Sequence, residues 1–169
     1  MEFICSCASP LGEITLAGSG GALTGLWFDG QRHDRETLSG QYAYGELPVF
    51  ALARQWLDAY FAGEAPGFTP PLLLSGSPFR RAVWQLLMEI PRGQTRTYGQ
   101  LATELVRRGA MPAASARAVG GAVAHNPVSL IVPCHRVVGA GGVLTGYAGG
   151  IDRKRRLLTL EGAELSRRP

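Results

Sequence analysis

The character of this chain changes after its first third, and the change limits the folds that it can adopt. Short apolar runs occupy residues 3–8, 13–17 and 22–28, and turn residues separate them, which is typical of a small antiparallel sheet. The polar stretch 29–45 is expected to be a loop. Pro48 then opens a segment whose apolar residues recur at helical spacing. The first part of the chain therefore predicts a small sheet with one helix.

The second part of the chain has a helical pattern and begins beyond a segment rich in proline and glycine, 63–71. Ser77 is suited to cap a helix, and Pro78 is suited to its first position. We therefore divide the chain into an N-terminal domain, 1–76, and a C-terminal domain, 77–169, and assign it to the α+β class.

Two further helices are expected in the C-terminal domain. Residues 97–100 fit a capping box, which predicts a helix up to Arg108, and a second helix is expected from Ala114 to Ala124. Two short helices joined by a tight turn with glycine form a helix-turn-helix pattern, although many helical hairpins share it. The second helix is rich in alanine and glycine, and Arg117 is its only long side chain. Such a helix can pack closely against another helix, or it can insert an arginine into a binding partner.

Positive charge is concentrated in the C-terminal domain. Residues 1–76 carry a net charge of −5 and residues 77–169 carry +9, so the whole chain carries +4. All but one of the 17 basic residues are arginines, which suit bidentate contacts with phosphates and bases. This asymmetry favours a nucleic-acid partner. The alternative is a solvated positive surface on an arginine-rich chain.

The cysteines and the apolar segments indicate the compartment. The chain has three cysteines, an odd number with no disulfide framework, which fits a reducing compartment. Its start has no basic region followed by a long apolar stretch, and no window resembles a membrane span. We therefore expect a soluble, cytoplasmic protein.

The sequence Val132-Pro133-Cys134-His135-Arg136 places three reactive or charged side chains inside an apolar, strand-like stretch. Burial alone raises the pKa of a thiol and leaves it inert, whereas basic neighbours make the thiolate available as a nucleophile. A buried arginine is costly unless a partner or a reaction requires it. Cys134 is therefore a candidate for covalent chemistry.

These residues resemble the active-site signature of the O6-alkylguanine-DNA alkyltransferases, also called methylated-DNA–protein-cysteine methyltransferases. The match to residues 131–138 is complete, and further segments resemble the family in the right order. They are Phe79–Trp84, Ile90–Gly93, Thr97–Ala102, Arg117–Ala122, Asn126-Pro127, Gly146–Gly150 and Leu157–Gly162. Over residues 1–76 the resemblance is loose. It implies a ribonuclease-H-like N-terminal sheet with a helix, and a helical C-terminal domain similar to a winged helix-turn-helix.

The resemblance implies a single transfer of an alkyl group from O6 of guanine, or less readily from O4 of thymine. Cys134 would accept the group, His135 would deprotonate it through a bound water, and Glu161 would orient that histidine. Asn126 would tie the preceding helix to the active-site segment, and from the residues alone it is also suited to end that helix. No cofactor is implied, and the thioether product would not regenerate the cysteine.

The resemblance also implies residues that bind duplex DNA and a base rotated out of it. Arg117 would fill the space that the base leaves. Tyr98 would promote the rotation, or it would serve only as a packing residue at the start of a helix. The remaining implied contacts are Ala118, Gly120 and Gly121 in the minor groove, and Tyr147, Pro133 and Gly149 in the base pocket.

Other basic and metal-binding side chains are expected to have structural roles. Arg136 is expected to form an internal salt bridge. The cluster 153–156 is expected to be a solvated helix face, with phosphate contact as the alternative. Some relatives carry an N-terminal zinc site, but Cys5 and Cys7 form a single C-x-C pair and His33 is distant in sequence, so we expect no metal.

Other classes of protein explain the sequence less well. A non-catalytic protein that binds alkylated DNA is the main alternative, although proteins of that kind replace the cysteine. A cysteine hydrolase would gain nothing from the basic C-terminal domain, and a pure transcriptional regulator would not need Cys134. We expect a monomer that binds double-stranded DNA containing O6-alkylguanine and no membrane, with side-by-side assembly on DNA as an alternative.

Overall fold

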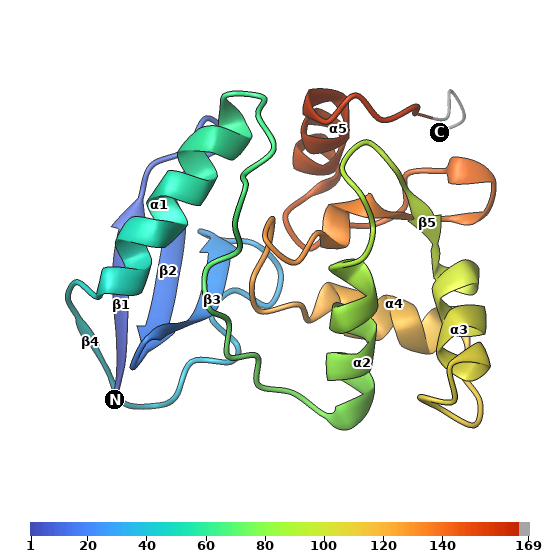
Figure 1. Cartoon of the computed structure of the whole chain (residues 1–169), viewed down its shortest axis with the longest axis horizontal. Coiled ribbons are helices and arrows are strands. Elements are labelled where there is room, and N and C mark those ends of the chain that lie inside the picture. The colour runs from blue at the N-terminus through green and yellow to red at the C-terminus, as the bar shows by residue number, and fades with distance from the viewer. Residues whose placement is uncertain (166–169) are drawn as a thin grey trace. The chain divides into compact units, whose positions relative to one another are not determined.

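The computed structural model describes residues 1–165, and the chain forms two compact units (Figure 1). The first unit contains Met1–Ser75 and Pro127–Ile131, and the second contains Gly76–Asn126 and the residues from Val132 onward. The chain therefore returns once to the first unit, whereas the sequence analysis places everything after residue 76 in one C-terminal domain.

A four-stranded sheet forms the first unit, in the order β3-β2-β1-β4. Strands β1 (Glu2–Cys7), β2 (Ile14–Ser19) and β3 (Ala22–Phe28) are antiparallel neighbours, as their apolar runs and turns predict. Strand β4 (Tyr42–Tyr44) pairs with β1 in parallel, so the prediction of a loop is wrong at this point. Its signal in the sequence is weak because β4 has three residues and lies at the edge of the sheet.

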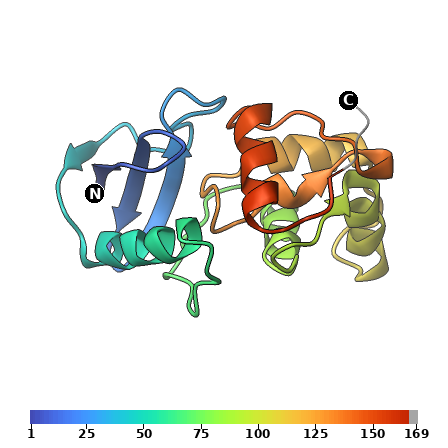
Figure 2. The same cartoon turned by 90° about the horizontal axis from the view of Figure 1, so that it is seen from above.

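Helix α1 (Pro48–Phe61) packs along one face of this sheet (Figure 2). Its buried face includes Phe50, Trp56 and Tyr60, and the rings of the last two stack with centroids 5.1 Å apart. A Cβ atom at Gly18 of β2 would lie 3.0 Å from the ring of Phe50. The glycine therefore allows the helix to approach the sheet closely.

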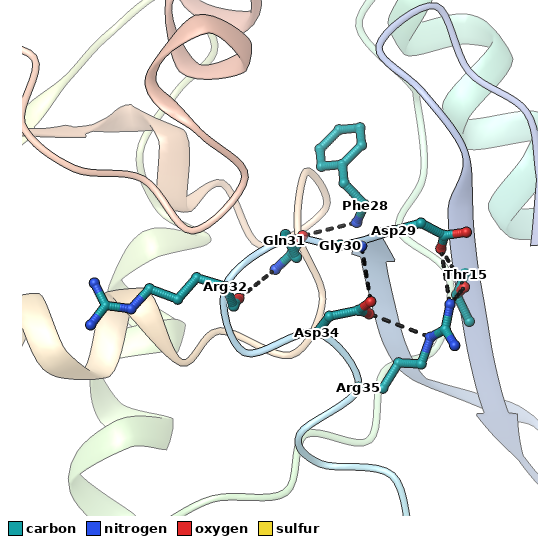
Figure 3. A network of polar contacts seen from close by, with 8 residues as sticks. All are labelled: Thr15, Phe28, Asp29, Gly30, Gln31, Arg32, Asp34 and Arg35. Atoms are coloured by element: carbon teal, nitrogen blue, oxygen red, sulfur yellow. Dashed lines mark hydrogen bonds and ion pairs between the residues drawn. The ribbon is translucent and has the colours of Figure 1, made fainter.

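Side-chain hydrogen bonds hold the loop after β3 (Figure 3). Asp29 Oδ1 accepts hydrogen bonds from Thr15 Oγ1 at 2.7 Å and from Arg35 Nη2 at 3.2 Å. Asp34 Oδ2 accepts from the backbone N–H of Gly30 at 3.0 Å. The loop is thus connected to β2 by side chains rather than by pairing of strands.

Helices dominate the second unit, together with one pair of short parallel strands. Helix α4 contacts both α2 and α3, and Trp84 of α2 donates from Nε1 to the carbonyl of Ala122 at 2.8 Å. No helix within residues 1–165 is long and apolar enough to cross a membrane. The elements are α2 (Pro78–Leu87), β5 (Arg96–Thr97), α3 (Tyr98–Arg107), α4 (Ala116–Ala124), the 3-10 helix η1 (Cys134–Arg136), β6 (Val137–Val138), the 3-10 helix η2 (Ala140–Gly142) and α5 (Ile151–Leu160).

Side-chain caps explain where three of these helices begin. Ser77, Thr97 and Ser115 each accept a hydrogen bond from a backbone N–H three residues later. Gln100 completes the predicted capping box by accepting from the N–H of Thr97 at 2.8 Å. Because such caps satisfy N–H groups that the first turn leaves unpaired, they define the start of the helix. Ser115 caps α4, which therefore begins at Ala116, slightly later than expected.

Candidate active site

A tight turn presents Cys134 inside the second unit. The apolar sequence predicts a strand here, but Cys134–Arg136 form a 3-10 helix, and strand β6 begins only after it. The N–H of Cys134 donates to the carbonyl of Val132 at 2.8 Å across Pro133. The prediction of a strand is wrong because a short apolar run does not distinguish a buried turn from a buried strand. The turn leaves Cys134 3% exposed and His135 fully buried.

The carboxylate of Glu161 binds two side chains of this turn. Glu161 caps the end of α5, and its Oε2 lies 2.8 Å from Nε2 of His135. Arg136 donates from Nε to Oε1 of Glu161 at 2.7 Å, and from Nη1 to the carbonyl of Ile90 at 2.6 Å. The internal salt bridge predicted for Arg136 is therefore confirmed.

The surroundings of the histidine and the carboxylate set their ionisation states. Burial lowers the pKa of His135, and the charges of Arg136 and Lys154 lower it further, although Glu161 opposes them. Burial alone would raise the pKa of Glu161, but hydrogen bonds from His135 and Arg136 outweigh it and bring the pKa to about 2. At neutral pH a neutral imidazole therefore faces a carboxylate. Such a pair can accept a proton on the imidazole and stabilise the resulting cation.

Polar side chains surround the thiol of Cys134. Burial raises its pKa, and hydrogen bonds from the side chains of Asn126 and Tyr147 and the charge of Lys154 act against burial. Asn126, which closely follows α4, also donates from Nδ2 to the carbonyl of Val132 at 2.8 Å. Because burial outweighs these effects, the thiol is protonated at neutral pH and needs a base before it can act as a nucleophile.

A glycine keeps Tyr147 in its place beside the thiol. A Cβ atom at Gly149 would lie 2.6 Å from Cε2 of Tyr147, so any other residue would displace the ring. Gly149 is itself buried, and so is Pro133, which precedes the cysteine. The three residues expected to form a pocket thus belong to the same buried region or adjoin it.

The exposed side of α4 combines small residues with one arginine. Arg117, Ala118 and Gly121 are exposed, and a Cβ atom at Gly121 would meet nothing within 4 Å. Within residues 1–165, no hydrogen bond or ion pair involves the Arg117 side chain. A Cβ atom at Gly120 would instead lie 3.7 Å from the ring of Tyr98, so that glycine faces α3.

The structure brings the residues expected around Cys134 into one cluster but leaves the exposed residues of α4 apart from it. Tyr98 lies at the edge of the cluster. Burial raises its pKa, and so does the proximity of Cys134, while its hydroxyl accepts a hydrogen bond from Thr145 Oγ1 at 3.5 Å. Arg117 lies with Ala118 and Gly121 on the outer surface of α4 rather than in the cluster around the thiol.

Lys154 is a site residue that is not predicted from the sequence. A solvated face is predicted for residues 153–156, but the side chain of Lys154 is fully buried, and its Nζ donates to the carbonyl of Thr145 at 3.1 Å. The prediction is therefore wrong for this residue. Helical spacing contains the missed signal, because Lys154 lies on the same buried face as Leu157 and Glu161.

Known proteins resemble this chain over both units. The family models for the 6-O-methylguanine DNA methyltransferase match residues 5–74 with the ribonuclease-like domain and residues 78–163 with the DNA binding domain. The methylated-DNA–protein-cysteine methyltransferase of Mycobacterium tuberculosis is 48% identical over 153 residues, which cover 90% of this chain and 88% of the relative. The enzyme of the same name from Methanosarcina acetivorans is 45% identical over 155 residues, which cover 92% of this chain and 95% of the relative.

Solved structures agree with the α+β class predicted from the sequence. The crystal structure of Mycobacterium tuberculosis OGT in complex with DNA has a TM-score of 0.82 and 46% identity, over 95% of this chain and 92% of that chain. The O6-methylguanine-DNA methyltransferase from Pyrococcus kodakaraensis strain KOD1 has a TM-score of 0.63 and 28% identity, over 96% of this chain and 100% of that chain. The matches to sequences and to structures thus extend over nearly the whole chain, which belongs to the 6-O-methylguanine DNA methyltransferase family.

Proposed function

We propose that this chain repairs DNA by transferring the alkyl group of O6-alkylguanine in duplex DNA to Sγ of Cys134. The observation that carries the proposal is the buried cluster in which Cys134 adjoins a neutral His135 that is held by an ionised Glu161. Family membership supports this reaction class. The crystal structure of the Mycobacterium tuberculosis relative in complex with DNA supports duplex DNA as the partner.

The reaction begins with loss of the thiol proton. Because burial keeps Cys134 protonated, His135 accepts that proton through a water molecule, and Glu161 stabilises the imidazolium that forms. The thiolate then attacks the alkyl carbon, so that an S–C bond forms and the bond between carbon and O6 breaks. The bonding electrons pass to guanine, which takes up one proton in place of the one that the thiol lost.

The product explains why each chain would react once. A thioether has no ionisable proton, so its sulfur is no longer a nucleophile of the kind that a thiolate provides. The reaction needs no cofactor, because the cysteine itself accepts the alkyl group. Guanine alkylated at O6 is the proposed main substrate, and thymine alkylated at O4 a poorer one.

A base stacked in a duplex cannot reach a buried thiol, so it must rotate out of the helix. The exposed small residues of α4 would allow a close approach to the minor groove, and Arg117 is long enough to fill the vacated space. Tyr98 lies between α4 and the cluster, where it would contact the DNA backbone beside the rotated base. Tyr147 would stack on that base next to the thiol.

Mass spectrometry tests the proposal directly. The protein is incubated with duplex DNA containing O6-methylguanine, and the peptide containing Cys134 is expected to gain one methyl group. Cys134→Ser should gain none, whereas Cys7→Ser, which removes a thiol from β1 of the first unit, should react like the unchanged protein. Binding of the DNA without a gain in mass would contradict alkyl transfer and support the alternative, a non-catalytic protein that binds the lesion.

A further inference from the structure

Leu130 is a buried residue with an unusual backbone conformation. Its side chain is 1% exposed, and its φ angle of 71° lies in the left-handed region, which L-residues other than asparagine and aspartate seldom adopt. We propose that Leu130 is a positioning residue for alkyl transfer, because its left-handed backbone forms a sharp turn that places the thiol of Cys134 for attack. This inference rests on the proposed function, since it assigns a role in that reaction to a residue outside the cluster around the thiol.

Two consecutive γ-turns lead to the cysteine. In the first, the N–H of Ile131 donates to the carbonyl of Ser129 at 2.8 Å around Leu130. A γ-turn with a positive φ at its centre is rare and strained. In the second, the N–H of Cys134 donates to the carbonyl of Val132 at 2.8 Å, and the central residue has a φ of −81° and a ψ of 66°, which is the common inverse form. The strain in this run is therefore located at Leu130.

The chain has to turn at Leu130 because hydrogen bonds fix the residues on both sides of it. The N–H of Ser129 donates to the carbonyl of Leu26 in β3 at 2.9 Å, which holds the segment beside that strand. The carbonyl of Val132 accepts from Nδ2 of Asn126 at 2.8 Å. Only two residues lie between Ser129 and Val132, and an extended backbone, which advances about 3.3 Å per residue, would carry the chain away from Asn126.

The position of the thiol depends on this turn. The carbonyl of Val132 accepts hydrogen bonds from Asn126 and from the N–H of Cys134, so both bonds fix the backbone of the residue that carries the thiol. Attack on the alkyl carbon requires Sγ to approach in line with the bond that breaks, and a displacement of about 1 Å can slow a reaction about a hundredfold. A change in the turn at Leu130 should therefore alter the rate of transfer.

Substitution by alanine and by glycine separates the backbone from the side chain. Both remove the buried leucine side chain, but glycine adopts a positive φ without strain and alanine does not. Leu130→Gly should therefore keep the turn, and Leu130→Ala should lose it. At a position with ordinary φ, glycine is the less stable of the two residues. The matched control is the pair Val128→Ala and Val128→Gly, because Val128 is buried in the same segment, bridges to β3 and has no positive φ.

The first experiment compares the four variants with the unchanged protein. The rate of reaction of Cys134 with free O6-benzylguanine, a substrate without phosphates, is measured well below each melting temperature. Leu130→Ala should react about tenfold more slowly than the unchanged protein, and Leu130→Gly should recover most of that loss. Leu130→Gly should also melt above Leu130→Ala, whereas Val128→Gly should melt below Val128→Ala. If a variant folds poorly, sucrose is added to all samples, because it favours the compact state.

A second measurement separates the inference from the proposed function. Hydrogen exchange of the Cys134 amide, followed by NMR, reports the turn without any reaction. Exchange should be faster in Leu130→Ala and close to the original rate in Leu130→Gly. Equal transfer rates in the two Leu130 variants, a Leu130→Gly that melts below Leu130→Ala, or equal exchange in both would overturn the inference and leave Leu130 a purely structural role. Absence of transfer from methylated DNA by the unchanged protein would instead overturn the proposed function, and the exchange rates would still decide whether Leu130 holds the turn.

Discussion

Glu161 supplies the negative charge that faces the buried His135 and the partly buried Arg136 of the turn Cys134–Arg136. It accepts hydrogen bonds from Arg136 at 2.7 Å and faces Nε2 of His135 at 2.8 Å, and its own side chain is fully buried. Removing one partner of a buried ion pair leaves the other charge without compensation, which is strongly destabilising. The same residue therefore supports both the fold of the second unit and the basicity of the histidine.

Replacement of Glu161 by glutamine should reveal both roles. Glu161→Gln keeps the shape but leaves Arg136 without its counter-charge, so we expect a loss of about 3 kcal/mol in the free energy of unfolding and slower transfer to Cys134. The matched control is Glu164→Gln, which changes the same chemical group at an exposed position. Urea unfolding measures the stability, and equal stability of the two variants would contradict the role of Glu161.

The pH dependence of stability gives this prediction a second readout. The pKa of Glu161 in the folded chain is about 2, which is below its value in an unfolded chain. The stabilisation is therefore present above pH of about 4 and is lost as the pH falls toward 2. The unchanged protein should lose stability over this window, and Glu161→Gln should lose less. A parallel loss in both would contradict the assignment.

Individual site residues differ in how far the sequence predicts them. Cys134, His135 and Arg136 are adjacent in the chain, so their unusual combination is visible in the sequence itself. Glu161 meets His135 only because α5 packs against η1, and the sequence analysis reaches it through the family resemblance. The basic neighbours of Lys154 favour a solvated face, although its spacing from the apolar residues of α5 indicates burial.

Among the secondary-structure elements, helix α4 has the amino-acid composition that is most directly explained by the proposed reaction. Apart from Arg117, its exposed face has only small side chains. Its other side carries the buried Val119, Ala122 and Val123. Glycine and alanine keep the helix thin on the exposed face, which suits close contact with a groove. Rotating a base out of a duplex costs a few kcal/mol, so a side chain that fills the gap has a measurable effect.

Arg117→Ala should therefore separate the two kinds of substrate. We expect transfer from O6-methylguanine in duplex DNA to slow by about tenfold or more, because nothing fills the space that the base leaves. The rate with free O6-benzylguanine should stay unchanged. Arg107→Ala, which removes an exposed arginine from α3, is the control for a general loss of positive charge. Equal losses on both substrates would contradict a role for Arg117 in rotating the base.

The elements that the sequence predicts well have local signals. Helices α2 and α3 begin at caps that are visible in the sequence, and their apolar spacing indicates which side is buried. Strand β4 and the turn at η1 lack such signals, because β4 depends on pairing with β1 and the turn lies within a continuous apolar run. Strand β4 and the turn at η1 therefore depend on interactions with distant parts of the chain.

At the scale of the whole molecule, the division into two units also depends on contacts between residues that are distant in sequence. Its charge asymmetry and its change of pattern predict two parts, but they do not predict that Pro127–Ile131 returns to the first unit. Backbone hydrogen bonds explain the return: the N–H of Leu26 donates to the carbonyl of Pro127, and the N–H of Ser129 donates to the carbonyl of Leu26, each at 2.9 Å. The chain thus leaves the second unit at Pro127 and re-enters it at Val132, just before the turn Cys134–Arg136.

In the proposed reaction, Cys134 accepts one alkyl group and is consumed in doing so. The most direct test is a titration in which the protein is incubated with increasing amounts of duplex DNA containing O6-methylguanine, and the methyl groups transferred per chain are counted. Transfer should reach a plateau at one methyl group per chain, all of it on Cys134, however much DNA is added. Transfer that continues beyond one group per chain, or methyl groups found on another residue, would contradict it.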